Sequence, residues 1–279
     1  MEAIANINGR TVLTAAELMA FAGGHRLPLP AGVPAAAEAL PTPEARDSVL
    51  EHASLCLYTR GVSLIDDEGP VANPALDQML RVLCRPLSRV VISRGTASAS
   101  TQQAISIGAE YSVLQAWDRL GLHFLYLAGL GETLDAVHAS AGESEVAARR
   151  PAPRTTVIDA ARVERIGGGS PDVARSMVAE EFLDSLSVGE QASFVGALVG
   201  DVAGTTMLFS TWNQAGHSEE LISWFDAGDA GAWRFQAIGF GAEGGADGGG
   251  GLRITLVGRD DLVALVDQAY GRLTVPTAT

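Results

Sequence analysis

The stretch Ala232-Trp-Arg-Phe-Gln-Ala-Ile-Gly239, continued after a glycine-rich interval by Leu252-Arg-Ile-Thr-Leu-Val257, decides the fold of this 279-residue chain. In both segments apolar and polar residues alternate, which is the period of a β-strand with one covered face and one face in water. Behind Asp260, a residue type that caps helices, the apolar residues from Leu262 to Ala269 recur at helical spacing. We therefore predict two strands followed by a closing helix.

The same kinds of pattern extend on both sides of this stretch and predict two similar series of elements. The later series comprises strands Thr205–Trp212, Glu220–Asp226, Ala232–Gly239 and Leu252–Val257 and the helix Asp260–Tyr270. The earlier series comprises strands Arg89–Arg94, Gln103–Gly108, Glu110–Asp118 and Leu122–Leu127 and a short helix carrying Leu130, Leu134 and Val137. Four strands and a helix are thus predicted twice.

Each series is preceded by a short strand and helical segments. In the first half these are a strand Thr11–Leu13, a helix capped by Thr14, a proline-rich loop from Leu27 to Pro43, a helix Glu44–Tyr58 and a helix opened by Asn73-Pro74. In the second half they are a strand Thr156–Ile158, a helix capped by Asp159 and a helical region Val173–Val199 interrupted near Ser187 to Gly189. In the Asn73-Pro74 helix, an apolar stripe predicts a buried face: Leu76, Met79, Leu80 and Leu83.

The two halves also align by sequence where they begin. Thr11-Val-Leu-Thr-Ala-Ala-Glu-Leu18 matches Thr156-Val-Ile-Asp-Ala-Ala-Arg-Val163 without gaps, and the fourth residue of each is a capping type. A shared element order behind an aligned start indicates an internal duplication. We predict an α+β fold with a quasi-two-fold repeat and a central antiparallel sheet on which helices pack. Its halves would be residues 1–142 and 154–279, joined by a linker at 143–153 and packed as one globular domain.

Charge and composition exclude several classes of function. The formal net charge is −14 and all 19 basic residues are arginine, with no basic stripe of the kind that binds nucleic acid. No run of 18 apolar residues and no secretory signal pattern occurs, so we expect a soluble cytoplasmic protein without membrane insertion. Cys56 and Cys84 have no neighbours of metal-binding or redox type, and we expect both to be buried thiols.

Motifs that carry chemistry are weak in this chain. Gly239-Phe-Gly-Ala-Glu-Gly244 matches a dinucleotide-binding pattern but is followed by more glycines and a strand rather than by a helix, so a hairpin is favoured. Gly167-Gly-Gly-Ser-Pro171 lacks the lysine of a phosphate-binding loop and indicates a capped helix start. The histidines, among them His123 and His138, have no carboxylate at ligand spacing. We predict no catalytic residue, no cofactor and no metal, and hence no enzyme.

The aromatic residues of the second half are more informative. Trp212, Trp224, Phe225 and Trp233 all lie in the later series of strands, where they could line a covered face or form a partner-binding patch. Trp224 and Phe225 are adjacent in one strand and point to opposite faces. The first half has Trp117 nearly alone, so the halves differ in aromatic content.

The segment from Arg60-Gly-Val-Ser-Leu-Ile-Asp-Asp-Glu-Gly69 through the helix opened by Asn73-Pro74 to Cys84-Arg-Pro86 resembles the EspG family of actinobacterial type VII (ESX) secretion chaperones. It has the acidic turn, the proline-started helix and the Leu-x-x-Leu ending typical of that family. Thr11–Leu18, the chain length and Leu252–Val257 with its following helix are also similar. The chain departs from the family pattern in the Leu27–Pro43 loop and in the glycine-rich segment Gly244–Gly251.

The resemblance implies a quasi-two-fold α+β fold without catalysis. It also implies that the chain binds helical PE/PPE-type secretion substrates and keeps them soluble. On that hypothesis we expect partner contacts at the hairpin Gly95–Thr101, near two phenylalanines of the second half and at its aromatic strands: Thr96, Ser98, Thr101, Phe182, Phe194, Trp212, Trp224 and Phe225. The alternative is a non-catalytic protein that holds a small apolar ligand between sheet and helices.

Overall fold

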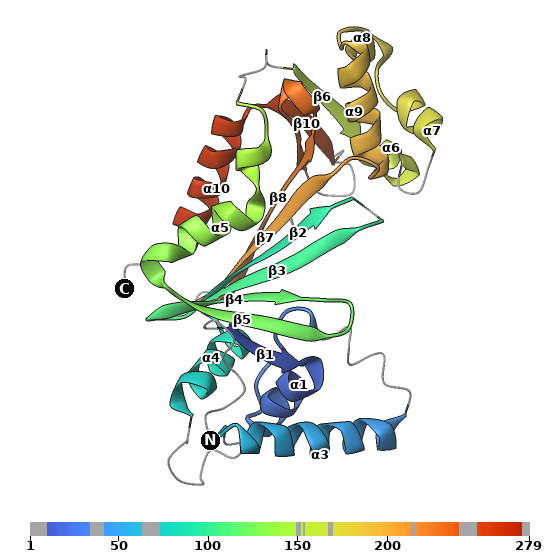
Figure 1. Ribbon diagram of the computed structural model, residues 1–279. Helices are drawn as coiled ribbons and strands as arrows, with labels where there is room; N and C mark the ends of the chain where they lie inside the picture. Colours follow the sequence, from blue (N-terminus) through green and yellow to red (C-terminus); the bar gives the residue numbers. More distant parts are fainter. Residues whose placement is uncertain are drawn as a thin grey trace. The chain divides into compact units, whose positions relative to one another are not determined.

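Ten strands form one sheet in the computed structural model, which describes residues 10–33, 42–62, 73–96, 98–148, 152, 154–166, 170–213, 216–239 and 250–274. The strand order is β1-β5-β4-β3-β2-β7-β8-β9-β10-β6 (Figure 1). The strands are β1 Arg10–Thr14, β2 Ser88–Gly95, β3 Ser100–Ile107, β4 Tyr111–Trp117, β5 Leu122–Gly129, β6 Arg154–Asp159, β7 Gly204–Asn213, β8 Gly216–Asp226, β9 Ala232–Ile238 and β10 Gly251–Val257. Every predicted strand is present, with ends that differ by a few residues.

The strand order confirms the duplicated α+β architecture with a large antiparallel sheet. It reads the same from either end when β1 to β5 are matched with β6 to β10. Antiparallel pairing is seen within each series, for example Val12 opposite Phe124 between β1 and β5, and Val157 opposite Arg253 between β6 and β10. The aligned segments Thr11–Leu18 and Thr156–Val163 thus occupy equivalent places, because each contains most of an edge strand and the start of the helix behind it.

The helices also follow the prediction, with differences in the second half. They are α1 Ala15–Gly24, α3 Pro43–Thr59, α4 Pro74–Cys84, α5 Thr133–Ala141, α6 Ala160–Ile166, α7 Pro171–Ser176, α8 Glu180–Asp184, α9 Val188–Val199 and α10 Arg259–Thr274. The helical region expected from Val173 is broken twice, since α7 ends before Met177 and α8 ends at Asp184. Ser187 then caps α9, so the predicted interruption near Ser187 to Gly189 falls at the start of this helix.

Two compact units divide the chain. One contains residues 1–91, 102–135 and 209–219, and the other contains residues 92–101, 136–208 and 220–279. The compact units differ from the predicted halves, because each unit includes one hairpin tip from the other half. The tip of β2–β3 belongs to the second unit, and the tip of β7–β8 belongs to the first.

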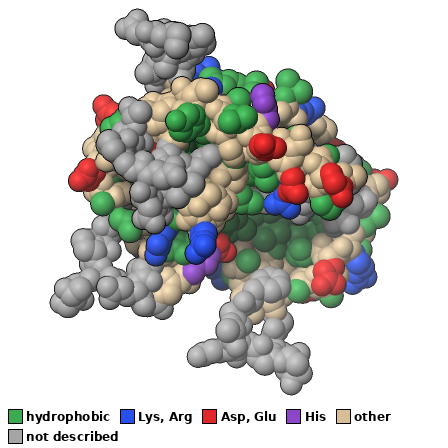
Figure 2. All heavy atoms as spheres, turned by 90° about the horizontal axis from the view of Figure 1, so that it is seen from below, with side chains coloured by type: hydrophobic (Ala, Val, Ile, Leu, Met, Phe, Trp, Pro, Cys, Tyr) green, Lys and Arg blue, Asp and Glu red, His purple; other side chains and the backbone are tan. Residues whose placement is uncertain are grey.

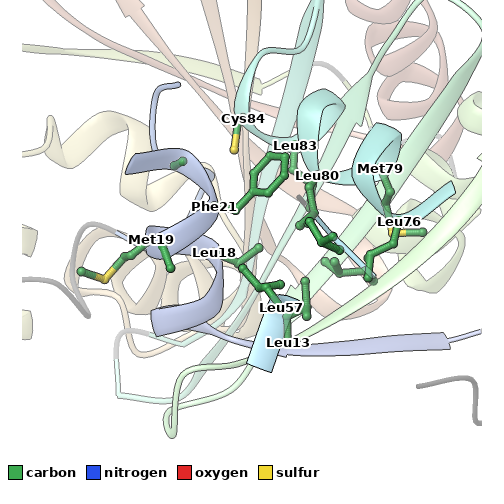
Figure 3. Close-up of a cluster of buried hydrophobic side chains, with 14 of the residues drawn as sticks. Leu13, Leu18, Met19, Phe21, Leu57, Leu76, Met79, Leu80, Leu83 and Cys84 are labelled. Atoms are coloured by element: carbon green, nitrogen blue, oxygen red, sulfur yellow. The ribbon is translucent and has the colours of Figure 1, made fainter. Parts of the chain in front are cut away.

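The first unit buries one hydrophobic core between its strands and three helices (Figure 3). Leu13 and Leu125 come from the sheet, Leu18 and Phe21 from α1, and Leu57 from α3. The predicted stripe of α4 is confirmed, since all four of its members lie in this core: Leu76, Met79, Leu80 and Leu83.

The second unit has a separate core rich in aromatic rings. Trp233 is fully buried, and its indole N–H donates to Ser193 Oγ at 3.0 Å, so its polar atom is satisfied. Phe194 lies 5.0 Å from Trp233 and 5.2 Å from Phe182 between ring centroids. Ile254 adds an aliphatic side chain from β10. Trp233, near the start of β9, is therefore covered by this core, as the alternation in this strand predicts for one of its faces.

The predicted cap of α1 is confirmed, whereas the predicted cap of α10 is not. Thr14 and Glu17 form a capping box, with the Thr14 N–H donating to Glu17 Oε2 at 2.8 Å and the Glu17 N–H to Thr14 Oγ1 at 3.1 Å. The prediction that Asp260 caps α10 is wrong. The helix begins at Arg259, and Asp261 accepts a hydrogen bond from the Gly258 N–H at 3.2 Å.

The segment 143–153 has the composition of a linker, but its first residues are packed. Glu143–Glu145 form a 3-10 turn after α5, and Glu143 and Val146 are buried. Composition alone does not reveal this packing, because it depends on contacts with residues that are distant in the sequence. One such contact is the 2.9 Å hydrogen bond from Arg259 Nε to the Val146 carbonyl.

Several predicted features lie partly or wholly outside the described residues. These are the acidic turn Asp66–Gly69, the glycines 167–169, residues 240–249 of the glycine-rich hairpin and residues 34–41 of the proline-rich loop. Of the helix start at Gly167–Pro171, the described part confirms the cap, since Ser170 Oγ accepts from the Val173 N–H at 3.5 Å.

The α4 stripe gives a first prediction. Leu80 is fully buried, so Leu80→Ala should lower the free energy of unfolding by about 2–5 kcal/mol, because it removes apolar contacts and leaves a cavity. Leu55→Ala is the control, since Leu55 is 60% exposed on α3 and its loss should change stability by less than about 0.5 kcal/mol. Urea unfolding followed by circular dichroism measures both. Equal effects would contradict the placement of α4 against this core.

Candidate partner-binding site

The tip of the β2–β3 hairpin is a tight turn closed by its own backbone. Thr96 and Ala99 exchange hydrogen bonds, N–H to carbonyl, at 3.0 and 3.2 Å. The Thr96 hydroxyl lies 3.1 Å from the Ser98 hydroxyl, and Thr101 Oγ1 donates to the Arg94 carbonyl at 3.3 Å. Ser98 and Thr101 are exposed and Thr96 is half-buried. The described residues of the predicted hairpin thus place hydroxyl side chains at its surface.

A concavity of about 440 Å³ lies at the base of this hairpin, within the second compact unit. The residues around it come from the ends of five segments: Arg94, Gly95, Thr101, Gly142, Glu145, Ala203, Gly204, Thr205, Trp224 and Asp226. Trp224 contributes the large apolar surface. Arg94 is ion-paired with Glu145, so the lining carries one basic and two acidic side chains.

Two glycines make this arrangement possible. Gly142 has a φ of +73° after the end of α5, and a Cβ there would overlap the Arg94 guanidinium. Gly95 has a φ of +136°, and a Cβ there would overlap the Ala99 carbonyl. The first glycine admits the arginine side chain and the second admits the tight turn, so both fix the shape of the concavity.

The concavity is suited to recognition. Its lining contains neither histidine nor cysteine, and its two hydroxyl groups donate to backbone carbonyls, Thr101 to Arg94 and Thr205 to Ala141 at 2.9 Å. A nucleophile needs a neighbouring base to accept its proton, and here these protons are already engaged. Around the concavity the nearly buried Trp224 lies beside charged side chains.

Among the predicted site residues, Thr101 and Trp224 are brought together in this concavity, with Thr96 and Ser98 at the tip above Gly95. Trp224 is only 2% exposed, so most of its ring is covered. Sequence reasoning did not find Arg94, Glu145 or Asp226. The position of Arg94 directly before a glycine turn could have indicated a role at the hairpin. Glu145 gave no such indication, because it lies in the segment predicted to be a linker.

The other predicted aromatic residues lie elsewhere. Phe194 is fully buried and Phe182 packs on it, so the structure places both in the aromatic core of the second unit. Phe225 packs on Phe235 at 4.8 Å between centroids, on the sheet face opposite Trp224. In this arrangement Phe194 offers no surface to a partner.

Trp212 belongs to the first compact unit, on the exchanged tip of β7–β8. Its ring is 38% exposed and stacks on His217 at 4.9 Å, with the Arg89 guanidinium 5.5 Å from its centroid. Burial lowers the pKa of Arg89, although the nearby Cys84 thiol acts in the opposite direction. Trp212 is thus an exposed aromatic side chain held in a fixed position.

His138 of the second unit contacts two carboxylates. Its Nδ1 bonds Glu143 Oε1, and its Nε2 lies 3.0 Å from Asp267 Oδ1 on α10. Two carboxylates thus meet His138 although the sequence places none at ligand spacing, since Glu143 follows it by five residues and Asp267 is brought to it by folding. Burial lowers the pKa of His138, but the hydrogen bonds and charges of both carboxylates outweigh burial and raise it.

Burial determines the protonation of two further titratable side chains, Cys84 and His123. Burial raises the pKa of the Cys84 thiol to about 12, so it stays protonated and unreactive, whereas Cys56 is half-buried rather than buried as expected. Burial lowers the pKa of His123 to about 4, and the imidazole stays neutral beside Gln115, whose Nε2 lies 2.8 Å from its Nδ1. Within the described ranges, no group of three or more histidine, cysteine, aspartate and glutamate side chains could hold a metal ion.

The surface charge agrees with the acidic composition. On the face shown in Figure 2, basic side chains occur in small groups interspersed with acidic and apolar ones, so this face has no basic stripe. Among the described helices, none combines the length and the apolar character that a membrane span requires.

Comparison with known proteins finds similarity in structure alone. No protein-family model matches the chain, and no curated protein matches it by sequence. Among solved structures, the chain is similar to the type VII secretion system chaperone EspG5 of Mycobacterium tuberculosis, solved in complex with the PE25–PPE41 dimer. The TM-score is 0.55 at 11% identity, over 97% of this chain and 98% of that one. The two chains share a fold from end to end, which confirms the resemblance predicted from sequence at the level of the fold.

The His138 bridge predicts a pH dependence of stability. Because its pKa is raised above the ordinary 6.5, the bridge should contribute fully below about pH 6.5 and lose its contribution as the pH rises through the raised pKa. The difference in melting temperature between wild type and His138→Gln should therefore be largest near pH 6 and shrink toward pH 9. His52→Gln, an exposed histidine on α3, is the control. A difference that grows with pH would contradict this assignment.

Proposed function

We propose that this chain is a cytoplasmic substrate-binding chaperone of a type VII (ESX) secretion system. The observation that carries the proposal is the end-to-end likeness of fold to the EspG5 chaperone. The sequence resemblance to the EspG family, built on Arg60–Pro86 and Thr11–Leu18, supports it independently. On this proposal the chain performs no catalysis and acts by binding.

The partner we propose is a helical PE/PPE-type heterodimer, by analogy with the dimer that the solved chaperone holds. The contact region is the β2–β3 hairpin with the concavity at its base. Ser98 and Thr101 are exposed there, and Trp224 and Arg94 line the concavity behind them. Polar residues around an apolar helix tip would bond with the exposed hydroxyl groups of this loop and with the charged groups behind it.

Binding is tested with the full chain and a PE/PPE pair encoded near it, using co-purification and calorimetry. Ser98→Arg combined with Thr101→Arg should weaken binding at least about tenfold, because two bulky charges would obstruct the hairpin surface. The charge-matched control carries two arginines on exposed polar residues away from the hairpin, Ser176→Arg at the end of α7 and Gln268→Arg on α10, and should bind as wild type. Trp224→Ala is less informative, since this buried ring also supports the fold.

The outcomes separate the site from the function. Unchanged binding by the double variant would reject the hairpin as the contact region while leaving the chaperone function intact. No binding to any such pair, together with thermal stabilisation by lipids or other small apolar molecules, would instead favour the alternative of a small-ligand-binding protein. Trp212→Ala, which removes the exposed ring of the other hairpin, shows whether that tip also contacts the partner.

A further inference from the structure

The chain leaves α5 through a turn that reaches the concavity at the base of the β2–β3 hairpin. The Gly142 N–H donates to the His138 carbonyl at 3.1 Å, and the positive φ of Gly142 then directs the chain into the Glu143–Glu145 turn. The Glu145 N–H closes this turn on the Gly142 carbonyl at 3.0 Å. Gly142 and Glu145 both line the concavity, and Glu145 pairs there with Arg94. The position of this turn therefore sets part of the proposed contact surface.

Between these two lining residues stands a buried carboxylate, that of Glu143. The residue is 2% exposed, and its Oε1 bonds His138 Nδ1. In the described part of the chain, its other oxygen, Oε2, has no hydrogen-bond partner. Arg94 and Arg259 reach the same turn from β2 and α10, but they contact Glu145 and a backbone carbonyl. His138 is thus the group that compensates the Glu143 charge, and a buried carboxylate without such a partner is strongly unfavourable.

His138 meets a second carboxylate on α10, which lies beside α5 (Figure 1). Its Nε2 is 3.0 Å from Asp267 Oδ1 while its Nδ1 bonds Glu143. A neutral imidazole has one N–H and can donate to one carboxylate, whereas an imidazolium donates to both at once. The two contacts together therefore require the charged form. Burial lowers the pKa of His138, but the hydrogen bonds and charges of both carboxylates outweigh burial and raise the pKa above the ordinary 6.5.

We propose that a clasp formed by His138, Glu143 and Asp267 positions the turn at the base of the hairpin, so that partner binding requires the charged imidazolium. The three side chains act through the turn and are positioning residues rather than contacts of the partner. This role rests on the chaperone function proposed above and makes its contact surface dependent on pH.

Loss of the charge on His138 acts on the concavity through the backbone. It leaves Glu143 as a buried carboxylate without a counter-ion, and movement of the turn toward water relieves that cost. Such a movement displaces Gly142 and Glu145. The Arg94 guanidinium, which lies against the first and is paired with the second, moves with them. Because Arg94 directly precedes the glycine of the hairpin turn, the effect reaches the surface that we expect to contact the partner.

Calorimetry of the full chain with a PE/PPE pair encoded near it, from about pH 6 to about pH 9, tests the proposal. The imidazolium is fully present below the ordinary pKa and is lost as the pH rises through the raised pKa, so wild-type affinity should fall at least about threefold over this range. His138→Gln lacks the charge and should bind at least about threefold more weakly than wild type near pH 6 and equally near pH 9. The ratio of the two affinities removes any titration of the partner itself. His52→Gln on α3 is the control and should bind as wild type at every pH.

Two further variants separate positioning from a general loss of structure. His138→Arg keeps a positive charge and several N–H donors, so it should retain the low-pH affinity of wild type across the whole range. Glu143→Gln removes the buried charge that His138 compensates, so the double variant with His138→Gln should bind like Glu143→Gln alone. Melting temperatures in the same buffers show which variants fold. If His138→Arg does not fold, the glutamine variants still decide.

A second measurement needs no partner. Hydrogen exchange followed by mass spectrometry near pH 6 should be faster in His138→Gln than in wild type at residues 142–146 and 92–101, and unchanged in α1. A ratio of affinities that stays constant with pH would overturn the proposal, as would a double variant weaker than Glu143→Gln or unchanged exchange at residues 92–101. Absence of wild-type binding at every pH would instead reject the chaperone function, and the exchange experiment would then decide the positioning role alone.

Discussion

The structure depends on hydrogen bonding between strands that are neighbours along the chain. Within each series of four strands, β2 to β5 and β7 to β10, neighbours along the chain are neighbours in the sheet. The short strand that begins each half then joins the far end of its series, β1 on β5 and β6 on β10. Because every backbone group inside the sheet needs a partner, this pairing leaves two outer edges and determines which residues stand at them.

This pairing also explains where the sites lie. Segments that are distant in the sequence meet where strands end, and the concavity at the base of the β2–β3 hairpin brings Arg94 together with Glu145 and Asp226 in that way. Helices α1, α3 and α4 fill the core of the first unit, and α6, α7 and α9 fill the aromatic core of the second. The indole of Trp233 is used for packing, whereas that of Trp224 borders the concavity. Residues of the same type in one block thus have different roles, set by the strand position of each.

Much of the fold could be predicted because alternation and helical spacing are local properties. The strands and the α4 stripe follow from short windows of sequence, and Ser187 marks the start of α9 in the same way. The positions of Glu143 and Asp267 beside His138 could not be predicted, because one looked like part of a linker and the other is 129 residues away. The sequence also could not show that Phe194 is buried and Trp212 is exposed, because this depends on which elements pack over each side chain.

The exchanged hairpin tips have a consequence for synthesis of the chain on the ribosome. Residues 209–219 complete the first compact unit, although the rest of that unit ends at residue 135. The first unit therefore cannot be complete until residue 219 has left the exit tunnel, by which time most of the second unit has been made. The order of translation thus favours joint completion of both units late in synthesis. A truncated product ending after the first half would lack one strand tip and leave its neighbour in the sheet exposed.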